Sequence, residues 1–449
     1  MVMLKTRDQL SQHPGSKPLW DGRWLLMAIV MAYFLTIALG SLALPAYRVW
    51  RNVLGVPALT TPFRDLRVIT AAWDCHRLGH DVLVDNPCLG GAPMNYPRLW
   101  LLPAVLGLNQ SHTLVLGVLV ALGFLSAVFV VIGRLTLGQA AIYGLVLCSP
   151  SVMLGVERGN SDLVVFVLLV GALMLLQRRQ PALRYSAYGL IWVAAALKLF
   201  PIVGLITALR ERRSRCFQIL GIGLGLFLLY GLLTWGDIQQ INAITPRATT
   251  LSYGSFVWLD RLLIPDRVLH GWRLSGLVSY EAVRTLLAAI AVLLAMVPSG
   301  LWAFKPTVYP MSREREELPT SLSGSCDNEC CLGLARDSFR LGAAIYLATF
   351  VLVGNNWDYR MIFLMLTMPQ LLAWITASNP LRSIARLTIA AIVFTSWWSR
   401  WSLWNLDELA NWIIAGSFTY YLGKLSPAWL QQVLAQPLNS SLLANKPKH

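Results

Sequence analysis

Long apolar runs separated by short polar segments occupy most of the chain. They predict helices near residues 24–46, 112–133, 136–156, 162–177, 216–235, 283–304, 341–354, 361–376, 385–399 and 409–423, with two shorter helices inside 185–209. About 20 helical residues cross the ~30 Å hydrocarbon core of a bilayer, so the longer runs can each span it. The runs lack the alternation of apolar and polar residues that is typical of β-strands. Helices are then the structure that satisfies the backbone hydrogen bonds in lipid. We predict an all-α polytopic membrane protein with about 12 transmembrane helices, two of them short and re-entrant.

The composition supports this prediction. Hydrophobic residues make up 56% of the 449 positions and charged residues only 13%, whereas soluble domains contain about 25% charged residues. A polar tail, Met1 to Arg23, precedes the first apolar run. That run is too long for the apolar region of a signal peptide, so we expect a retained first helix.

The net charge of +15 is explained by orientation in the membrane. If the N-terminus is cytoplasmic, the inner segments hold 22 Lys and Arg against 9 Asp and Glu, and the outer segments hold 14 against 13. This asymmetry is the positive-inside pattern. We therefore expect a multi-pass protein of the plasma (inner) membrane with both termini in the cytoplasm and no nucleic-acid partner.

The predicted helices divide the chain into four parts. Residues 1–23 form a cytoplasmic tail, 24–235 a first membrane module with the outer loop 47–111, 236–423 a second module with the outer loop 236–282 and the cytoplasmic loop 305–340, and 424–449 a cytoplasmic tail. In the first outer loop, Phe63, Leu66, Ile69 and Trp73 recur at helical spacing. They predict an amphipathic helix able to lie in the membrane interface, and Tyr96 to Pro103 begin a second interfacial element.

The cysteines leave alternatives open. Cys75 and Cys88 share the first outer loop and could pair if that compartment is oxidising. Cys326, Cys330 and Cys331 could hold zinc, but the sequence places no fourth ligand beside them. We favour a solvated loop there and expect no metal site.

The stretch from Tyr185 to Leu209 is flanked by arginines on both sides. Its 25 residues give ~37 Å of helix, enough for one crossing and not two. We predict a re-entrant pair of helices with its apex at Lys198 to Pro201, because proline cannot continue the first helix. Lys198 would then face an internal cavity, where an ionisable group is a functional candidate. The alternative is a single crossing with one basic cluster outside.

Four polar patterns fall at helix junctions near the outer side. They are Phe63-Arg64-Asp65-Leu66, Glu157-Arg158-Gly159-Asn160-Ser161-Asp162, Lys198-Leu199-Phe200-Pro201 and Gly354-Asn355-Asn356-Trp357-Asp358-Tyr359-Arg360. Charge concentrated at one end of several helices predicts a shared polar cleft.

These patterns, with Tyr96-Pro97 and Pro103 between the first two, resemble glycosyltransferase family 87 of the GT-C superfamily. The resemblance runs from the first to the tenth helix. It implies a GT-C-like bundle in which 24–235 is the catalytic module. It also implies an inverting enzyme of the cell envelope that moves a sugar, with mannose one candidate, from a polyprenyl-phosphate carrier to a lipid or glycan acceptor on the outer face.

The resemblance maps the catalytic carboxylate onto Asp65. Related families often have two acids side by side, whereas this chain has Arg64-Asp65-Leu66, so we expect no metal ion and no other cofactor. A carboxylate in a low-dielectric cleft can take the proton of the acceptor hydroxyl, and positioned cations can bind the leaving phosphate. The candidates for phosphate binding are Arg158, Lys198 and Arg360.

Other polar residues are assigned supporting or structural roles. Glu157, Asn160, Asp162, Asp358 and Tyr359 are expected to support the site. Structural interpretations are also open: Asp65 as a charge at a helix N-terminus, Asn160 as an N-cap, Glu157, Arg158 and Asp162 as members of ion pairs, and Asp358 as the partner of Arg360. In the second outer loop, the lower-ranked cations are Arg247, Arg261, Arg267 and His270. Its apolar residues Phe256, Trp258, Leu262 and Leu263 could line a groove for the polyprenyl tail.

Two other functions remain open at this point. A transporter or flippase for lipid or solute would line a pathway with paired charges, but such proteins commonly have repeated halves, and none is visible here. A polymer ligase using a lipid-linked donor would depend on a loop histidine such as His270 instead of Asp65.

Overall fold

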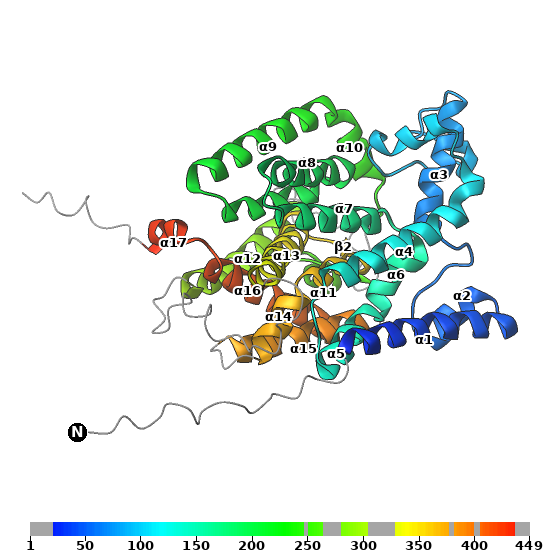
Figure 1. Ribbon diagram of the computed structural model, residues 1–449. Helices are drawn as coiled ribbons and strands as arrows, with labels where there is room; N and C mark the ends of the chain where they lie inside the picture. Colours follow the sequence, from blue (N-terminus) through cyan, green and yellow to red (C-terminus); the bar gives the residue numbers. More distant parts are fainter. Residues whose placement is uncertain are drawn as a thin grey trace, which may run out of the picture.

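The computed structural model describes residues 21–246, 250–263, 280–303, 328–376, 381–398 and 405–435. Within these ranges the chain is helical apart from turns and one antiparallel pair of two-residue strands, β1 (Ser252–Tyr253) and β2 (Asn356–Trp357). Helices run roughly parallel in a bundle, and α3 (Arg64–Arg77) stands at one end of it (Figure 1). One apolar core contains residues from Leu26 to Leu425, so both halves of the described chain contribute to it.

Four helices are long and apolar enough to cross a membrane. They are α1 (Gly22–Ala43), α4 (Thr113–Val131, with the preceding turn from Gln110), α9 (Arg213–Leu233) and α12 (Tyr280–Ala303). Their leucines remain largely exposed, as expected of side chains that face lipid. The described part of the chain is thus a helical bundle with at least four candidate spans, while the total of about 12 stays a prediction.

The expected single helix at 136–156 is wrong. Two helices, α5 (Leu137–Leu147) and α6 (Pro150–Arg158), meet at an angle of 55° and together form one more candidate span. Ser149 caps α6 by accepting a hydrogen bond from the Val152 N–H at 3.4 Å. Proline favours the first helical position and, inside a helix, removes a backbone hydrogen bond and clashes with the preceding turn, which accounts for the break at Pro150.

The expected hairpin between the two arginine clusters is present. Its arms are α8 (Pro181–Lys198) and the 3₁₀ helix η5 (Phe200–Arg210), and the apex lies at Lys198 to Pro201. Arg184 and Glu211, at the open ends of the arms, form an ion pair of 3.1 Å. The first arm is longer than expected, and the second is a 3₁₀ helix. Whether the hairpin re-enters a bilayer stays a prediction.

The segment predicted to be the first outer loop is a small folded unit. It contains α2 (Ala46–Arg48), the π-helical turn η1 (Val49–Val53), α3, η2 (Pro87–Leu89), η3 (Arg98–Leu106) and η4 (Gln110–His112). Cys75 and Cys88 form a disulfide. The expected amphipathic helix is α3, but its apolar face, with Ile69 and Trp73, is buried in the loop's own core and is not open to lipid.

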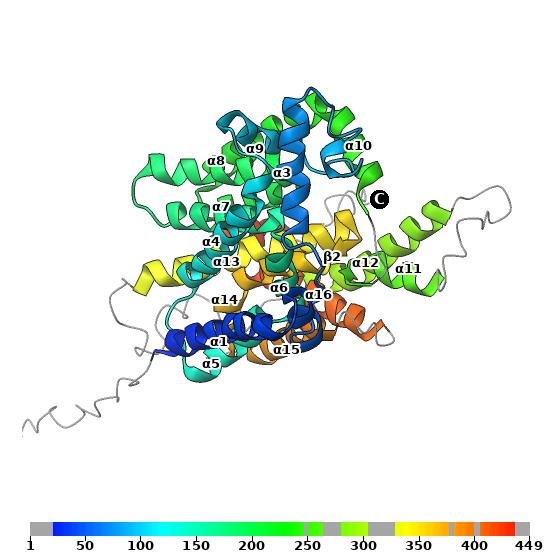
Figure 2. The same ribbon diagram turned by 90° about the vertical axis from the view of Figure 1, so that its right-hand side faces the viewer.

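The remaining elements complete the bundle. They are α7 (Ser161–Leu176), α10 (Trp235–Ile244), α11 (Val257–Leu263), α13 (Asn328–Ala348), η9 (Thr349–Val353), η10 (Asp358–Leu366), α14 (Met368–Thr376), α15 (Arg382–Trp398), α16 (Leu406–Lys424) and α17 (Ala428–Ala435). Turned by 90°, the molecule shows α3 beside the ends of α4 and α6, against which it packs (Figure 2). The span expected to begin at 341 starts earlier, because α13 extends into the segment expected to be loop. The span expected at 361–376 is instead η10 followed by α14.

Candidate functional site

The start of α3 is fixed by close packing around Phe63. This residue has φ +52° and donates its N–H to the Glu157 carbonyl at 3.1 Å. Its ring lies on Gly117 of α4, where a Cβ would come within 2.3 Å of a ring carbon. Gly159 (φ +57°) would place a Cβ 3.1 Å from the same ring. Because only glycine leaves room for this ring, the first turn of α3 is held against α4 and the end of α6.

That position brings Asp65 to the second polar pattern. The Asn160 amide donates to Asp65 Oδ2 at 2.6 Å, and an Arg158 nitrogen lies 3.5 Å from Asp65 Oδ1. Arg158 also lies 3.5 Å from Glu157, whose other oxygen accepts the Leu59 N–H at 3.1 Å. Both Arg158 contacts are ion pairs longer than the usual ~2.9 Å hydrogen bond. The guanidinium therefore keeps donors for a further anion.

Asn160 and Asp162 connect the hairpin apex to Asp65 and its neighbours. Asn160 is the N-cap of α7, and its Oδ1 accepts the Asp162 N–H at 2.9 Å. Lys198 Nζ lies 3.2 Å from Asn160 Oδ1, 2.8 Å from Ser161 Oγ and 2.8 Å from the fully buried carboxylate of Asp162. An ammonium has three donors, and each of these has an acceptor within reach.

The apex itself is held by two distant side chains. Leu199 has φ +59°, a conformation costly for a residue with a Cβ. Trp100 donates to the Leu197 carbonyl at 3.1 Å and Tyr230 to the Ala196 carbonyl at 2.9 Å. These donors satisfy carbonyls that the end of α8 leaves without helical partners. The position of Lys198 is therefore set by the first outer loop and by α9 as well as by its own helix.

Tyr96 forms part of the wall beside Lys198. The Lys198 Nζ lies 5.3 Å from the centre of the Tyr96 ring. Burial, with the nearby charge of Asp65, raises the pKa of Tyr96 well above its ordinary value. A tyrosine phenol is protonated at neutral pH even at its ordinary pKa, so Tyr96 can act as a hydrogen-bond donor here.

Arg360 reaches the same group from the fourth pattern. Its Nε lies 3.6 Å from Asp162 Oδ2, and its guanidinium lies 5.3 Å from the centre of the Phe200 ring. It also donates to the Asn356 side chain, whose amide donates to the Thr349 carbonyl at 2.7 Å. Arg360 is thus positioned by β2 and by the start of η9.

The structure brings together most of the residues singled out from the sequence. The cluster has three cations and three carboxylates; we call it the outer cluster: Asp65, Glu157, Arg158, Asp162, Lys198 and Arg360. Tyr359 packs against Gly155 of α6. Asp358 is fully buried, and its N–H donates to the Leu251 carbonyl at 2.9 Å.

In the described part of the segment 236–282, Arg261 forms ion pairs with α16. Arg261 pairs with Asp407 of α16 at 2.8 Å, and Phe256 packs on Gly354 and on the guanidinium of Arg284. Trp258 is half-buried on α11. The lower-ranked candidates Arg247, Arg267 and His270 lie outside the described residues, as do the side chains of Leu262 and Leu263.

Three residues of this site were not assigned to it from the sequence: Tyr96, Ser161 and Asn356. Each lies within a pattern that was noticed, but neither local spacing nor residue type shows which side chains of a pattern turn inward. Among the described residues, His, Cys, Asp and Glu form no group of three or more suited to a metal ion. Cys326 lies outside them, as do the side chains of Cys330 and Cys331.

Comparison with protein-family models, with curated proteins and with solved structures finds no match to this chain. A partly exposed carboxylate lies beside cations that keep free donors, at one end of an apolar bundle. Such a site can bind an anionic group and accept a proton next to it.

Proposed function

We propose that the chain is an inverting glycosyltransferase that uses a polyprenyl-phosphate-linked sugar and a lipid or glycan acceptor on the outer face of the membrane. One observation carries this proposal. Asp65 lies within 3.5 Å of Arg158 and 2.6 Å of Asn160, so a base and a phosphate-binding cation share one site. The resemblance to glycosyltransferase family 87 supplies the reaction class.

In the proposed reaction the acceptor oxygen attacks the anomeric carbon from the face opposite the phosphate. The new glycosidic C–O bond forms while the bond from the anomeric carbon to the phosphate oxygen breaks. The polyprenyl phosphate leaves with the electron pair, and the acceptor proton passes to Asp65. Asn160 occupies one lone pair of this carboxylate, which leaves others for the acceptor hydroxyl. A positioned base of this kind contributes ~10²–10⁴ to the rate.

The three cations take different parts in this proposal. Arg158 and Arg360 contact their carboxylates at 3.5 and 3.6 Å and can form charge-assisted hydrogen bonds with the donor phosphate. Lys198 has an acceptor for each of its donors within 3.2 Å. It binds phosphate only by giving up one of these contacts, so we assign it chiefly to positioning Asn160 and Asp162.

The experiment is sugar transfer by the purified full chain with polyprenyl-phosphate hexoses, mannose first. Asp65→Asn should lower the rate at least a hundredfold, the smallest effect typical of a lost base. The matched control is Asp85→Asn, the same chemical change at an exposed position of the same loop. Equal activity of Asp65→Asn and Asp85→Asn would refute the role of Asp65.

The same assay separates the two alternatives. A ligase would retain activity in Asp65→Asn and lose it on substitution of His270. A transporter would move labelled lipid or solute across vesicle membranes without forming a glycosidic product.

A further inference from the structure

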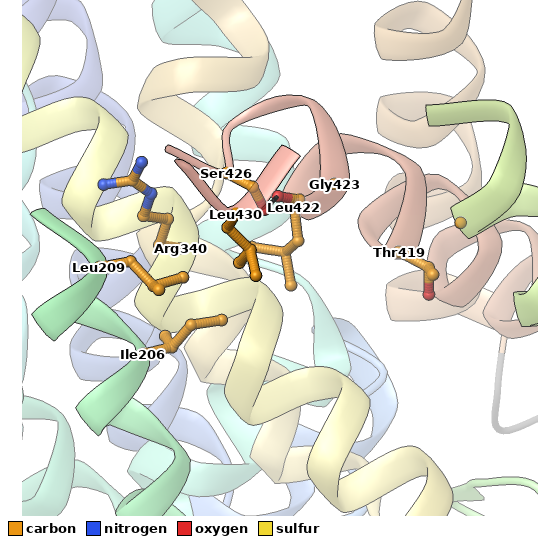
Figure 3. Close-up of a pocket in the computed structure, with 9 residues that line it drawn as sticks. Ile206, Leu209, Arg340, Thr419, Leu422, Gly423, Ser426 and Leu430 are labelled. Carbon is orange, nitrogen blue, oxygen red and sulfur yellow. Dashed lines mark hydrogen bonds between the residues drawn. The ribbon is translucent and has the colours of Figure 1, made fainter. Parts of the chain in front are cut away.

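A cavity of about 280 Å³ opens at the end of the bundle away from the outer cluster. It lies between η5, α12, α13, α16 and α17, and most of the side chains that line it are apolar (Figure 3). Its size is close to the ~300 Å³ at which small-molecule pockets begin. The lining residues are Ile206, Leu209, Gly300, Arg340, Thr419, Leu422, Gly423, Ser426 and Leu430.

The two ends of the bundle can be told apart by its contacts. The α7 helix starts at the outer cluster with Ser161 and is followed by Gln177, which donates to Asp337 at 3.2 Å. Its 16 residues span ~24 Å. Asp337 and Arg340 lie near the middle of α13, and that helix leads on to Thr349 beside Asn356. The cavity therefore opens towards the end opposite the disulfide-bearing loop.

One buried cation lines this cavity. Arg340 is 6% exposed and donates to the Leu425 carbonyl. Among the described carboxylates, Asp337 lies 3.5 Å from it and is also paired with Arg210 at 2.5 Å. Two arginines thus share one carboxylate. A buried charge without full compensation is unfavourable, and an anion bound beside Arg340 and Arg210 would complete the balance.

The surroundings of the cavity carry the same sign of charge. Cations outnumber carboxylates among the described residues at this end: Arg184, Arg210, Arg212, Arg213, Arg215, Arg336, Arg340 and Lys424 against Glu211 and Asp337. Arg213 lies over the ring of Trp429 of α17 at 5.6 Å. That helix also supplies Leu430 to the cavity wall. An apolar cavity with a basic rim complements a molecule that has an acyl chain and a phosphate.

We propose that this cavity, here called the inner cavity, binds an anionic phospholipid from the leaflet opposite the disulfide-bearing loop. The acyl chain lies along Ile206, Leu209 and Leu422, and the phosphate binds at Arg340 with Arg210. Basic pockets between helices on the cytoplasmic side of membrane proteins bind anionic headgroups by the same chemistry. This site is separate from the outer cluster, and its occupancy does not depend on sugar transfer.

The test measures lipid retained by the purified full chain in neutral detergent, by native mass spectrometry and by the shift in Tm. Phosphatidylglycerol should bind and raise Tm, whereas phosphatidylcholine should bind at least tenfold more weakly because it lacks net negative charge. Arg340→Gln should weaken phosphatidylglycerol binding about tenfold, the effect of one charge-assisted hydrogen bond. Arg51→Gln, the same change at an exposed arginine of η1 in the disulfide-bearing loop, should bind as the wild type does.

Leu209→Trp provides an independent variant, because it fills the cavity without changing charge. It should also reduce retention of phosphatidylglycerol, and it keeps the test decisive if Arg340→Gln does not fold. Equal binding of the two lipids, or equal loss in Arg340→Gln and Arg51→Gln, would overturn the proposal. If inorganic phosphate at the same concentration gave the same Tm shift, the ligand would be a free anion and not a lipid, and the proposal would also be overturned.

Discussion

Asn160 joins Asp65 to the hairpin apex, and its two functions can be separated by substitution. Its amide donates to the Asp65 carboxylate at 2.6 Å, and its oxygen caps α7 at 2.9 Å. A hydrogen bond to a charged group contributes about 1.5–3 kcal/mol, and a cap contributes about 1 kcal/mol. Asn160→Ser keeps a capping oxygen but is too short to reach Asp65. It should lower the free energy of unfolding by about 1.5–3 kcal/mol, and Asn160→Ala by about 1 kcal/mol more.

A double-mutant cycle with Asp65→Asn isolates the contact. Once the charged acceptor is gone, Asn160→Ser should cost little more, so the two losses should fall short of additivity by at least about 1 kcal/mol. Denaturation in detergent, followed by the fluorescence of the 18 tryptophans, measures each variant. Asn109→Ser is the control, because Asn109 caps a helical turn through Ser111 without contacting a carboxylate. If Asn160→Ser is as stable as Asn109→Ser, the contact with Asp65 contributes nothing and the reasoning is refuted.

Three further predictions concern other parts of the molecule. Cys75→Ser opens a loop with a sequence separation of 13 and should cost about 3 kcal/mol; a reducing agent should lower Tm of the wild type to that of the variant, and an unchanged Tm would contradict this. Gly117→Ala should cost about 1–3 kcal/mol, because its Cβ would meet a ring at 2.3 Å, whereas Gly225→Ala in α9, with nothing within 4 Å, should not destabilise. The hydrogen bond from Arg98 holds the pKa of Asp81 in the folded chain below its ordinary 3.8, so the unfolded chain is protonated first as the pH falls. The stability that this hydrogen bond contributes is complete above the ordinary pKa. It is lost as the pH falls through the lower pKa of the folded state. Asp81→Asn should therefore flatten the fall of Tm with acid, and an unaltered profile would contradict the assignment.

The sequence predicted the helical class and the positions of the long apolar helices, because burial in lipid requires continuous apolar runs. It also predicted the hairpin apex, since Pro201 and the arginines on both flanks leave few other solutions. The break before Pro150 was missed because the residues on both sides are equally apolar. The sequence did contain a local indication of the break, because serine followed by proline is typical of a helix start.

The sequence predicted that the residues of the outer cluster lie together, because their patterns fall at helix ends on the same side. It did not predict which of these side chains pair with one another. Asp162 and Lys198 could be placed near the same end of the bundle, but their 2.8 Å contact depends on where Leu199 turns the chain. Arg360 was expected to bind phosphate or pair with Asp358, and the structure adds contacts with Asp162, Asn356 and the ring of Phe200. The strand pair β1–β2, which positions Asn356, is too short for any periodic pattern to indicate it.

The two tethers at the apex, from Trp100 and Tyr230, restrict how a substrate can enter. If the disulfide-bearing loop swung away like a lid, the Leu197 carbonyl would lose its donor in apolar surroundings, which costs about 1–3 kcal/mol. Lys198 would lose its fixed place at the same time. Entry from the side, between helices and along the plane of the bilayer, leaves both tethers intact and suits a substrate that is itself dissolved in lipid.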